Sequence, residues 1–183
     1  AAHGLWVLPS PTGYRAITTL ESTQHHRSLK EAYARLGEVS YTIMTDSIAN
    51  MAQFTRLGNR AFRFIKQHSQ APHVYLLPVY RTLPKTIAHQ PRHDVGFAMS
   101  HDPLLHRLLA DTQQTFVSCD LIAPSTHDAW YDWMTCQDFL DWLGLPVDCA
   151  VDADRLYQGH MACVDCRDGD AHLLMSEESS QEC

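Results

Sequence analysis

Short apolar runs of the length typical of β-strands recur along most of this chain. They are rich in β-branched and aromatic residues, which favour a pleated, half-buried backbone. We predict strands at Leu5 to Leu8, Tyr41 to Met44, Val74 to Val79, Val95 to Met99, Thr115 to Cys119, Val147 to Val151, Ala162 to Val164 and Ala171 to Met175.

Segments with helical periodicity separate several of these runs. The run from Asn59 to His68 places Ala61, Phe62 and Ile65 on one face and basic side chains on the other. Aspartate followed by proline is a helix start, and glycine followed closely by proline is a helix stop. We predict helices at Leu29 to Leu36, Ile48 to Phe54 and Asn59 to His68, a helix opened by Asp102 and Pro103, and a helix from Thr135 to Leu143 that ends at Gly144.

The alternation of strands and helices predicts an α/β protein with a mixed sheet. The chain has 183 residues, and a chain of this length forms one domain by default. We predict a single domain over residues 1–175, followed by a polar and acidic tail over residues 176–183.

Composition and charge narrow the possible partners. Hydrophobic residues make up 45% of the chain, but no apolar run approaches the length that crosses a bilayer. The formal net charge of -7 disfavours broad attraction to nucleic acid, so RNA binding would have to be local. The opening residues have no basic leader, and the six cysteines are scattered. We therefore expect a cytoplasmic protein without membrane contact.

Several motifs in one order resemble the YrdC/YciO family. Pro9, Thr12 and Tyr14 match in register the family's P-T-D-[ST]-x-Y turn after the first strand. The segment from Val95 to Pro103 is similar to its G-[MV]-R-x-P-x-x-P junction, and Thr115 to Pro124 is similar to its S-T-S-x-x strand. The segment from Val147 to Asp165 is similar to its V-D and P-[ST]-T region.

The resemblance implies a YrdC-like fold, which is a twisted mixed sheet flanked by helices with a large concave cavity. Family members make threonylcarbamoyl-AMP from ATP, threonine and bicarbonate, so ATP and Mg²⁺ are the cofactors that the resemblance implies. The background function is tRNA modification, the synthesis of threonylcarbamoyladenosine, and some members have been linked to binding double-stranded RNA.

This chain departs from the family at the residues that grip the ligands. The K-x-R clamp corresponds to a stretch in which Lys30 and Arg35 are candidates at the wrong spacing. The arginine of the G-[MV]-R-x-P motif is replaced by Ala98, which removes a planar charged fork. The S-x-N motif falls at Asp120, whose carboxylate would repel phosphate unless a metal bridged them.

Some polar residues of the implied site persist. They are Ser10, Thr12 and Tyr14 on the first turn, with Ser118 and Asp120 nearby by analogy. Together they are sufficient to bind a nucleotide or another small polar ligand through hydrogen bonds. The same residues also suit a simple turn and a strand end, because serine and threonine are common there.

His160, Cys163 and Cys166 are the candidate ligands for a metal site. Their residue types suit zinc, but Cys163 and Cys166 are separated by an odd number of positions and would point to opposite faces of a strand. We predict no metal site, and a buried hydrophobic role for the cysteines.

Three functions remain open. The first is a divergent YciO-like protein that binds a nucleotide or RNA and has largely lost the synthase residues. The second is an active ATP-dependent threonylcarbamoyl-AMP synthase, a nucleotidyltransferase, with a clamp rearranged from Lys30, Arg35 and Arg15. The third is a non-catalytic structural or regulatory partner. Fold resemblance alone does not choose among them, so enzyme activity is left open.

Overall fold

The computed structural model describes residues 4–10, 13–34, 39–80, 83–84, 86–87, 94–99, 103–121, 135–152 and 161–174. Its strands are β1 (Leu5–Ser10), β2 (Gly13–Thr19), β3 (Thr42–Thr45), β4 (His73–Pro78), β5 (Asp94–Met99), β6 (Phe116–Asp120), β7 (Cys149–Ala150), β8 (Ala162–Asp165) and β9 (His172–Leu173). Its helices are α1 (Thr23–Tyr33), α2 (Ile48–Met51), α3 (Asn59–Gln67), α4 (Pro103–Thr112) and α5 (Cys136–Leu143).

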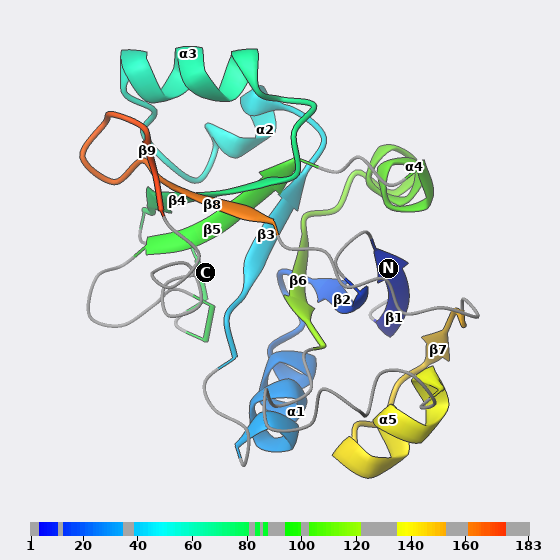
Figure 1. The fold of residues 1–183 in the computed structure, drawn as a ribbon. Helices are drawn as coiled ribbons and strands as arrows, with labels where there is room; N and C mark the ends of the chain where they lie inside the picture. The colour runs from blue at the N-terminus through cyan, green and yellow to red at the C-terminus, as the bar shows by residue number, and fades with distance from the viewer. Residues whose placement is uncertain are drawn as a thin grey trace.

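The strands form one mixed sheet in the order β7-β1-β2-β6-β3-β5-β4-β8-β9 (Figure 1). The hairpin of β1 and β2 joins the rest of the sheet through the antiparallel pairing of β2 with β6. At the centre, β3 pairs antiparallel with β6 and parallel with β5. The predicted α/β class and the twisted mixed sheet flanked by helices are therefore confirmed.

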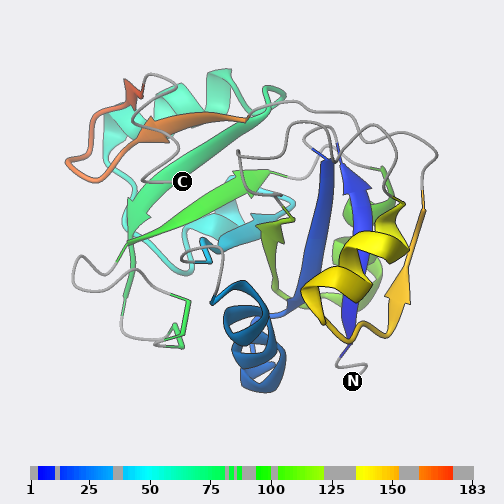
Figure 2. The ribbon, with the colours of Figure 1, turned by 60° about the horizontal axis from the view of Figure 1, so that its bottom comes forward.

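The two faces of the sheet are covered unequally. The larger buried cluster packs one face against α1, α2, α3 and α5, and we call this face the four-helix face. The smaller cluster packs the other face against α4 alone, through Leu105 and Leu109, and we call it the α4 face. In Figure 2, α5 (yellow) lies in front of the β1–β2 hairpin and α4 (green) lies behind it.

Several elements differ from the predicted ones. The helix predicted from Ile48 to Phe54 ends at Met51, and the strand predicted from Val147 to Val151 is shortened to Cys149–Ala150. The strand β2 was not predicted, because the charged Arg15 interrupts the apolar pattern of its run. The helix α1 begins at Thr23 instead of at Leu29, and its first half buries His26, a residue that the apolar pattern did not count. The predicted end of this helix, at Leu36, lies outside the described residues.

The helix signals read from the sequence are confirmed in α5 and at the start of α4. Thr135 caps α5 in a reciprocal capping box with Asp138, and Gly144 ends the helix at φ 69°. Pro103 is the first residue of α4, while its predicted cap, Asp102, and the polar tail lie outside the described residues. Among the described residues, no helix has the length and apolar character needed to span a bilayer.

His26 shows how tightly the four-helix face is packed. Its Nε2 lies 3.2 Å from the Thr19 carbonyl oxygen, and its Nδ1 lies 3.3 Å from the Thr86 hydroxyl, so the neutral ring is bonded at both nitrogens. Burial penalises the charged ring and lowers the pKa of His26 from 6.5 to about 4. The folded protein therefore holds this ring uncharged at neutral pH.

The buried ring makes stability depend on pH. Between about pH 6.5 and about pH 4, the unfolded chain binds a proton at His26 that the folded chain does not bind, so stability falls as pH falls. As the pH falls through this window, the wild type loses stability that His26→Gln does not have to lose. The difference in unfolding free energy between the two proteins should therefore decrease by at most about 3 kcal/mol. Urea unfolding at a series of pH values measures the gap.

The matched control is His106→Gln on the exposed surface of α4. The change of its gap to wild type over the same pH range is the baseline with which the change for His26→Gln is compared. A gap for His26→Gln that stays constant between these pH values would contradict the buried, neutral ring.

Candidate polar site on the α4 face

A row of charged residues crosses the α4 face at one end of the central strands. Thr42 pairs with both Ser118 of β6 and Gly96 of β5. Asp120 lies two residues after Ser118, and Asp94 lies two residues before Gly96. Because β6 runs antiparallel to β3 and β5 runs parallel to it, the two aspartates lie at the same level on either side of β3. We call this set the polar row; its members are Arg15, Asp94, Asp120, Asp165 and Arg167.

Arg15 is a buried cation with one charged partner among the described residues. It lies opposite Asp120 in the β2–β6 register and is 6% exposed. Its Nε donates to one Asp120 oxygen, and its Nη2 lies 3.3 Å from the other. The guanidinium also contacts the sulfur atoms of Met44, at 3.9 Å, and Met161, at 2.9 Å. Since Met161 directly precedes β8, the chain entering β8 lies against this part of the face.

Arg167 holds the other end of the row. Its Nη1 donates to Asp94 at 3.0 Å, and its Nη2 and Nε donate to the two Asp165 oxygens at 2.6 and 2.9 Å. Asp94 is 4% exposed, so this contact neutralises a carboxylate that is removed from water. The hydrogen bonds from Arg167 lower the pKa of Asp165, which stays ionised.

Beside the row, the sheet presents a floor with little side-chain bulk. A Cβ atom at Gly96 would lie 2.8 Å from Val74 Cγ1 and 3.3 Å from the Thr42 hydroxyl, so glycine keeps this position flat. Ser118 is 1% exposed, and its hydroxyl has no hydrogen-bond partner among the described residues. A buried hydroxyl without a partner is uncommon in folded proteins.

The charges of the row define what it can bind. Two arginines face three aspartates, so the described part of the row is acidic overall. Each guanidinium already has a carboxylate, so an incoming anion must compete with it. Such a row suits a small ligand that carries both charges better than it suits a polyanion.

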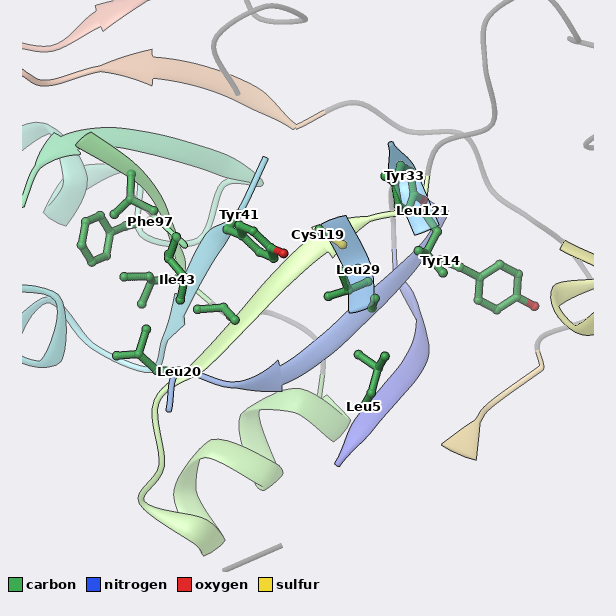
Figure 3. Packing of buried hydrophobic residues seen from close by; sticks show 14 of the residues in the cluster. Leu5, Tyr14, Leu20, Leu29, Tyr33, Tyr41, Ile43, Phe97, Cys119 and Leu121 are labelled. Atoms are coloured by element: carbon green, nitrogen blue, oxygen red, sulfur yellow. The ribbon is translucent and has the colours of Figure 1, made fainter. Parts of the chain in front are cut away.

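The predicted site residues divide between the two faces. Ser10, Ser118 and Asp120 belong to the α4 face by the alternation of their strands, and Ser118 and Asp120 lie beside Arg15. Tyr14 lies on the four-helix face, where its hydroxyl donates to Asp152 at 2.7 Å. Figure 3 shows its ring pointing from β2 toward the segment of α5 and β7.

Neither residue of the predicted clamp joins the row in the described structure. Lys30 is exposed on α1, which packs on the four-helix face, so it lies on the other side of the sheet from Arg15. Arg35 lies outside the described residues, as does Thr12. Ala98 is fully buried beneath α4, in a position that has no room for an arginine.

The cysteines do not form a described metal site. Cys163 and Cys166 are both buried, and burial raises the pKa of the Cys166 thiol to about 12. His160 lies outside the described residues. The structure groups no three histidine, cysteine, aspartate or glutamate side chains for a metal within the part of the chain that it describes.

Sequence reasoning missed most of the row. The sequence places Arg15 only in an alternative clamp and gives no motif that includes Asp94 or Arg167. Each member lies in a strand or just beyond a strand end, and this placement is the only signal in the sequence. The partners are far apart along the chain, so only the sheet register brings them together.

The two residues of the Arg15–Asp120 pair should differ in their effect on stability. Asp120→Asn leaves a buried guanidinium without its charged partner and should lower the unfolding free energy by about 3 kcal/mol. Arg15→Met leaves a carboxylate that is 32% exposed and can be hydrated, so a loss of about 1 kcal/mol is expected.

The double variant should be more stable than the sum of the two losses implies, since it removes both charges. Chemical unfolding of the four proteins gives this coupling energy. Equal and additive losses would be incompatible with a buried pair.

Comparison with known proteins finds relatives of low sequence identity. An uncharacterised protein of Haemophilus influenzae is 23% identical over 123 residues, which are 67% of this chain and 59% of that protein. YciO of Escherichia coli is 20% identical over 127 residues, which are 67% of this chain and 60% of YciO. The matched segment thus spans about three fifths of the length of these relatives.

Solved structures share the fold. The crystal structure of E. coli YciO has a TM-score of 0.77 at 18% identity and covers 94% of this chain and 82% of YciO. The structure of P. abyssi Sua5 complexed with L-threonine has a TM-score of 0.72 at 15% identity and covers 97% of this chain and 53% of Sua5. At these identities the likeness establishes the fold.

The family model for Sua5, YciO and YrdC proteins, described as "Telomere recombination", matches residues 1–173. This match covers nearly the whole chain and agrees with the motif order from Pro9 to Asp165. The chain belongs to the Sua5/YciO/YrdC family.

Proposed function

We propose that this chain is a divergent Sua5/YciO/YrdC protein that binds a small zwitterionic ligand, such as an amino acid, on the polar row. In this proposal the threonylcarbamoyl-AMP synthase reaction is weak or absent. The observation that carries the proposal is the buried Arg15–Asp120 pair beside the unpartnered hydroxyl of Ser118.

The three side chains are complementary to an amino acid. A guanidinium fork binds a carboxylate, a partly exposed aspartate accepts from an ammonium group, and a hydroxyl bonds a polar side chain. An amino acid that binds between Arg15 and Asp120 would thus place its carboxylate on the guanidinium and its ammonium group on the aspartate, so both charges would keep a partner. The structure of P. abyssi Sua5 complexed with L-threonine supports this class of ligand on the same fold.

The same charges disfavour polyanionic ligands. Phosphoryl chemistry needs cations or Mg²⁺ on the triphosphate, whereas the described row has more carboxylates than guanidiniums. The backbone of RNA is a still poorer match, because Arg15 is buried and the chain has a net charge of -7. Binding of a nucleotide or of RNA on the polar row is therefore less well supported than binding of a zwitterionic ligand.

The alternative of an active synthase requires cations from elsewhere. A clamp of Lys30, Arg35 and Arg15 is not supported by the described residues, because Lys30 and Arg15 lie on opposite sides of the sheet. The alternative of a structural or regulatory partner requires that no small ligand binds on the row.

Calorimetric titration with L-threonine tests the proposal. We expect saturable binding to the wild type and a loss of about tenfold in affinity for Arg15→Lys, because lysine keeps the charge but loses the fork. Ser118→Ala should weaken binding without lowering stability, since it removes a buried hydroxyl that has no described partner.

The control is Lys30→Ala, which changes an exposed cation on the other face and should bind as the wild type does. If the wild type gives no saturable heat with L-threonine, and L-threonine also leaves its melting temperature unchanged, the alternative of a non-catalytic structural or regulatory partner is favoured. Saturable heat with ATP and Mg²⁺ alone would favour the nucleotide-binding form.

Pyrophosphate release separates binding from catalysis. With ATP, Mg²⁺, L-threonine and bicarbonate, we expect release no faster than in the absence of threonine, because the described row lacks a phosphate clamp. Threonine-dependent release that is abolished by Lys30→Ala or Arg35→Ala would establish the active synthase and overturn the proposed loss of activity.

A further inference from the structure

The ends of β3 and β5 form a crevice at the opposite end of these strands from the polar row. The two strands are parallel neighbours, so their carboxyl ends, Thr45 and Met99, meet at one edge. The chain leaves β3 toward α2 on the four-helix face and leaves β5 toward α4 on the other face. Figure 1 shows these strand ends between α2 and α4. Connections that diverge to opposite faces open a crevice where α/β proteins bind ligands.

A pocket of about 470 Å³ occupies this crevice. Its walls include Asp46 after β3, Met99 at the end of β5, His106 and Arg107 of α4, and the residue pair Ser69 and Gln70 after α3. This volume lies in the range of pockets that bind small molecules. Four separate parts of the chain therefore line the pocket, and its walls carry an acidic side chain, Asp46, and a basic one, Arg107.

The α4 wall favours an anion. His106 and Arg107 are exposed on the side of α4 that lines the pocket, where the guanidinium is a charged donor and the imidazole ring has two nitrogens for hydrogen bonds. Arg107 donates from Nε to Asp111 at 2.6 Å, one turn later in the helix. An incoming anion must compete with Asp111 for this guanidinium, but both side chains of the pair are largely exposed, so the pairing is weak.

The opposite wall favours hydrogen-bond donors. One Asp46 oxygen accepts from the Ser47 hydroxyl at 3.0 Å and from the Asn50 side-chain amide, which holds the carboxylate in place. Beside it, Thr45 is 3% exposed, and its hydroxyl has no partner among the described residues. Thr45 precedes Asp46 and pairs with Met99, and both of these neighbours line the pocket, although Thr45 itself does not.

We infer that this crevice is a second binding site, for a small phosphorylated molecule with hydroxyl or amino groups at its other end. The phosphate binds at His106 and Arg107, and the hydroxyl or amino groups donate to Asp46. The site is separate from the polar row, because it lies at the carboxyl ends of β3 and β5 and shares no residue with the row. The inference does not depend on the proposed function.

Titration of isotope-labelled protein with ribose 5-phosphate, followed by NMR, tests the inference. Saturable shifts are expected at Asp46, Ser69 and His106 in the millimolar range or below. Arg107→Gln should weaken binding by about tenfold, because it removes the guanidinium and keeps the helix propensity. Ala110→Phe, at an exposed position that lines the pocket, should fill it and abolish binding.

Three comparisons complete the test. Ribose and inorganic phosphate should each bind more weakly than ribose 5-phosphate, because each engages one wall. The matched control Arg63→Gln, on the exposed surface of α3, and Arg15→Lys, in the polar row, should leave binding unchanged.

The inference is overturned by the absence of saturable shifts, by unchanged affinity in Arg107→Gln, or by equal affinity for inorganic phosphate. Loss of binding in Arg15→Lys would overturn the separation of the two sites. Failure of L-threonine to bind the wild type would affect the proposed function alone.

Discussion

The antiparallel pairing of β2 with β6 is the contact on which both the fold and the candidate site depend. It attaches the amino-terminal hairpin to the central strands and places Arg15 opposite Asp120 and Ile17 opposite Ser118. A slip of one residue would turn Arg15 into the apolar four-helix face and Ala16 out of it. The energetic penalty of an unpaired buried arginine therefore fixes this register.

The unequal covering of the sheet separates most of the apolar core from most of the buried charges. Four helices seal one face with most of the buried apolar residues, whereas the other face has α4 alone and keeps its charges. Arg15 and Arg167 remain on this face because each is neutralised by neighbouring carboxylates. The same neutralisation reduces the attraction of these two guanidinium groups for a triphosphate.

The sequence predicted elements far better than it predicted contacts. The capping box at Thr135, the αL glycine at Gly144 and the proline start of α4 were predictable, because they act within a few residues. The strand β2 was missed because Arg15 breaks its pattern, and only Asp120, a residue 105 positions away, explains the charge. Tyr14 and Ser10 were grouped as neighbours on one turn, but strand alternation sends them to opposite faces.

The sequence by itself determined the fold class, the family and the order of the elements other than β2, because local periodicity and motif order survive substitution of single residues. Tertiary structure alone decided which charges meet, since the sheet register joins Arg15 to Asp120 and Asp94 to Arg167 across long separations. It likewise decided the place of the crevice, because a pocket between diverging connections has no signature within any one segment of the chain.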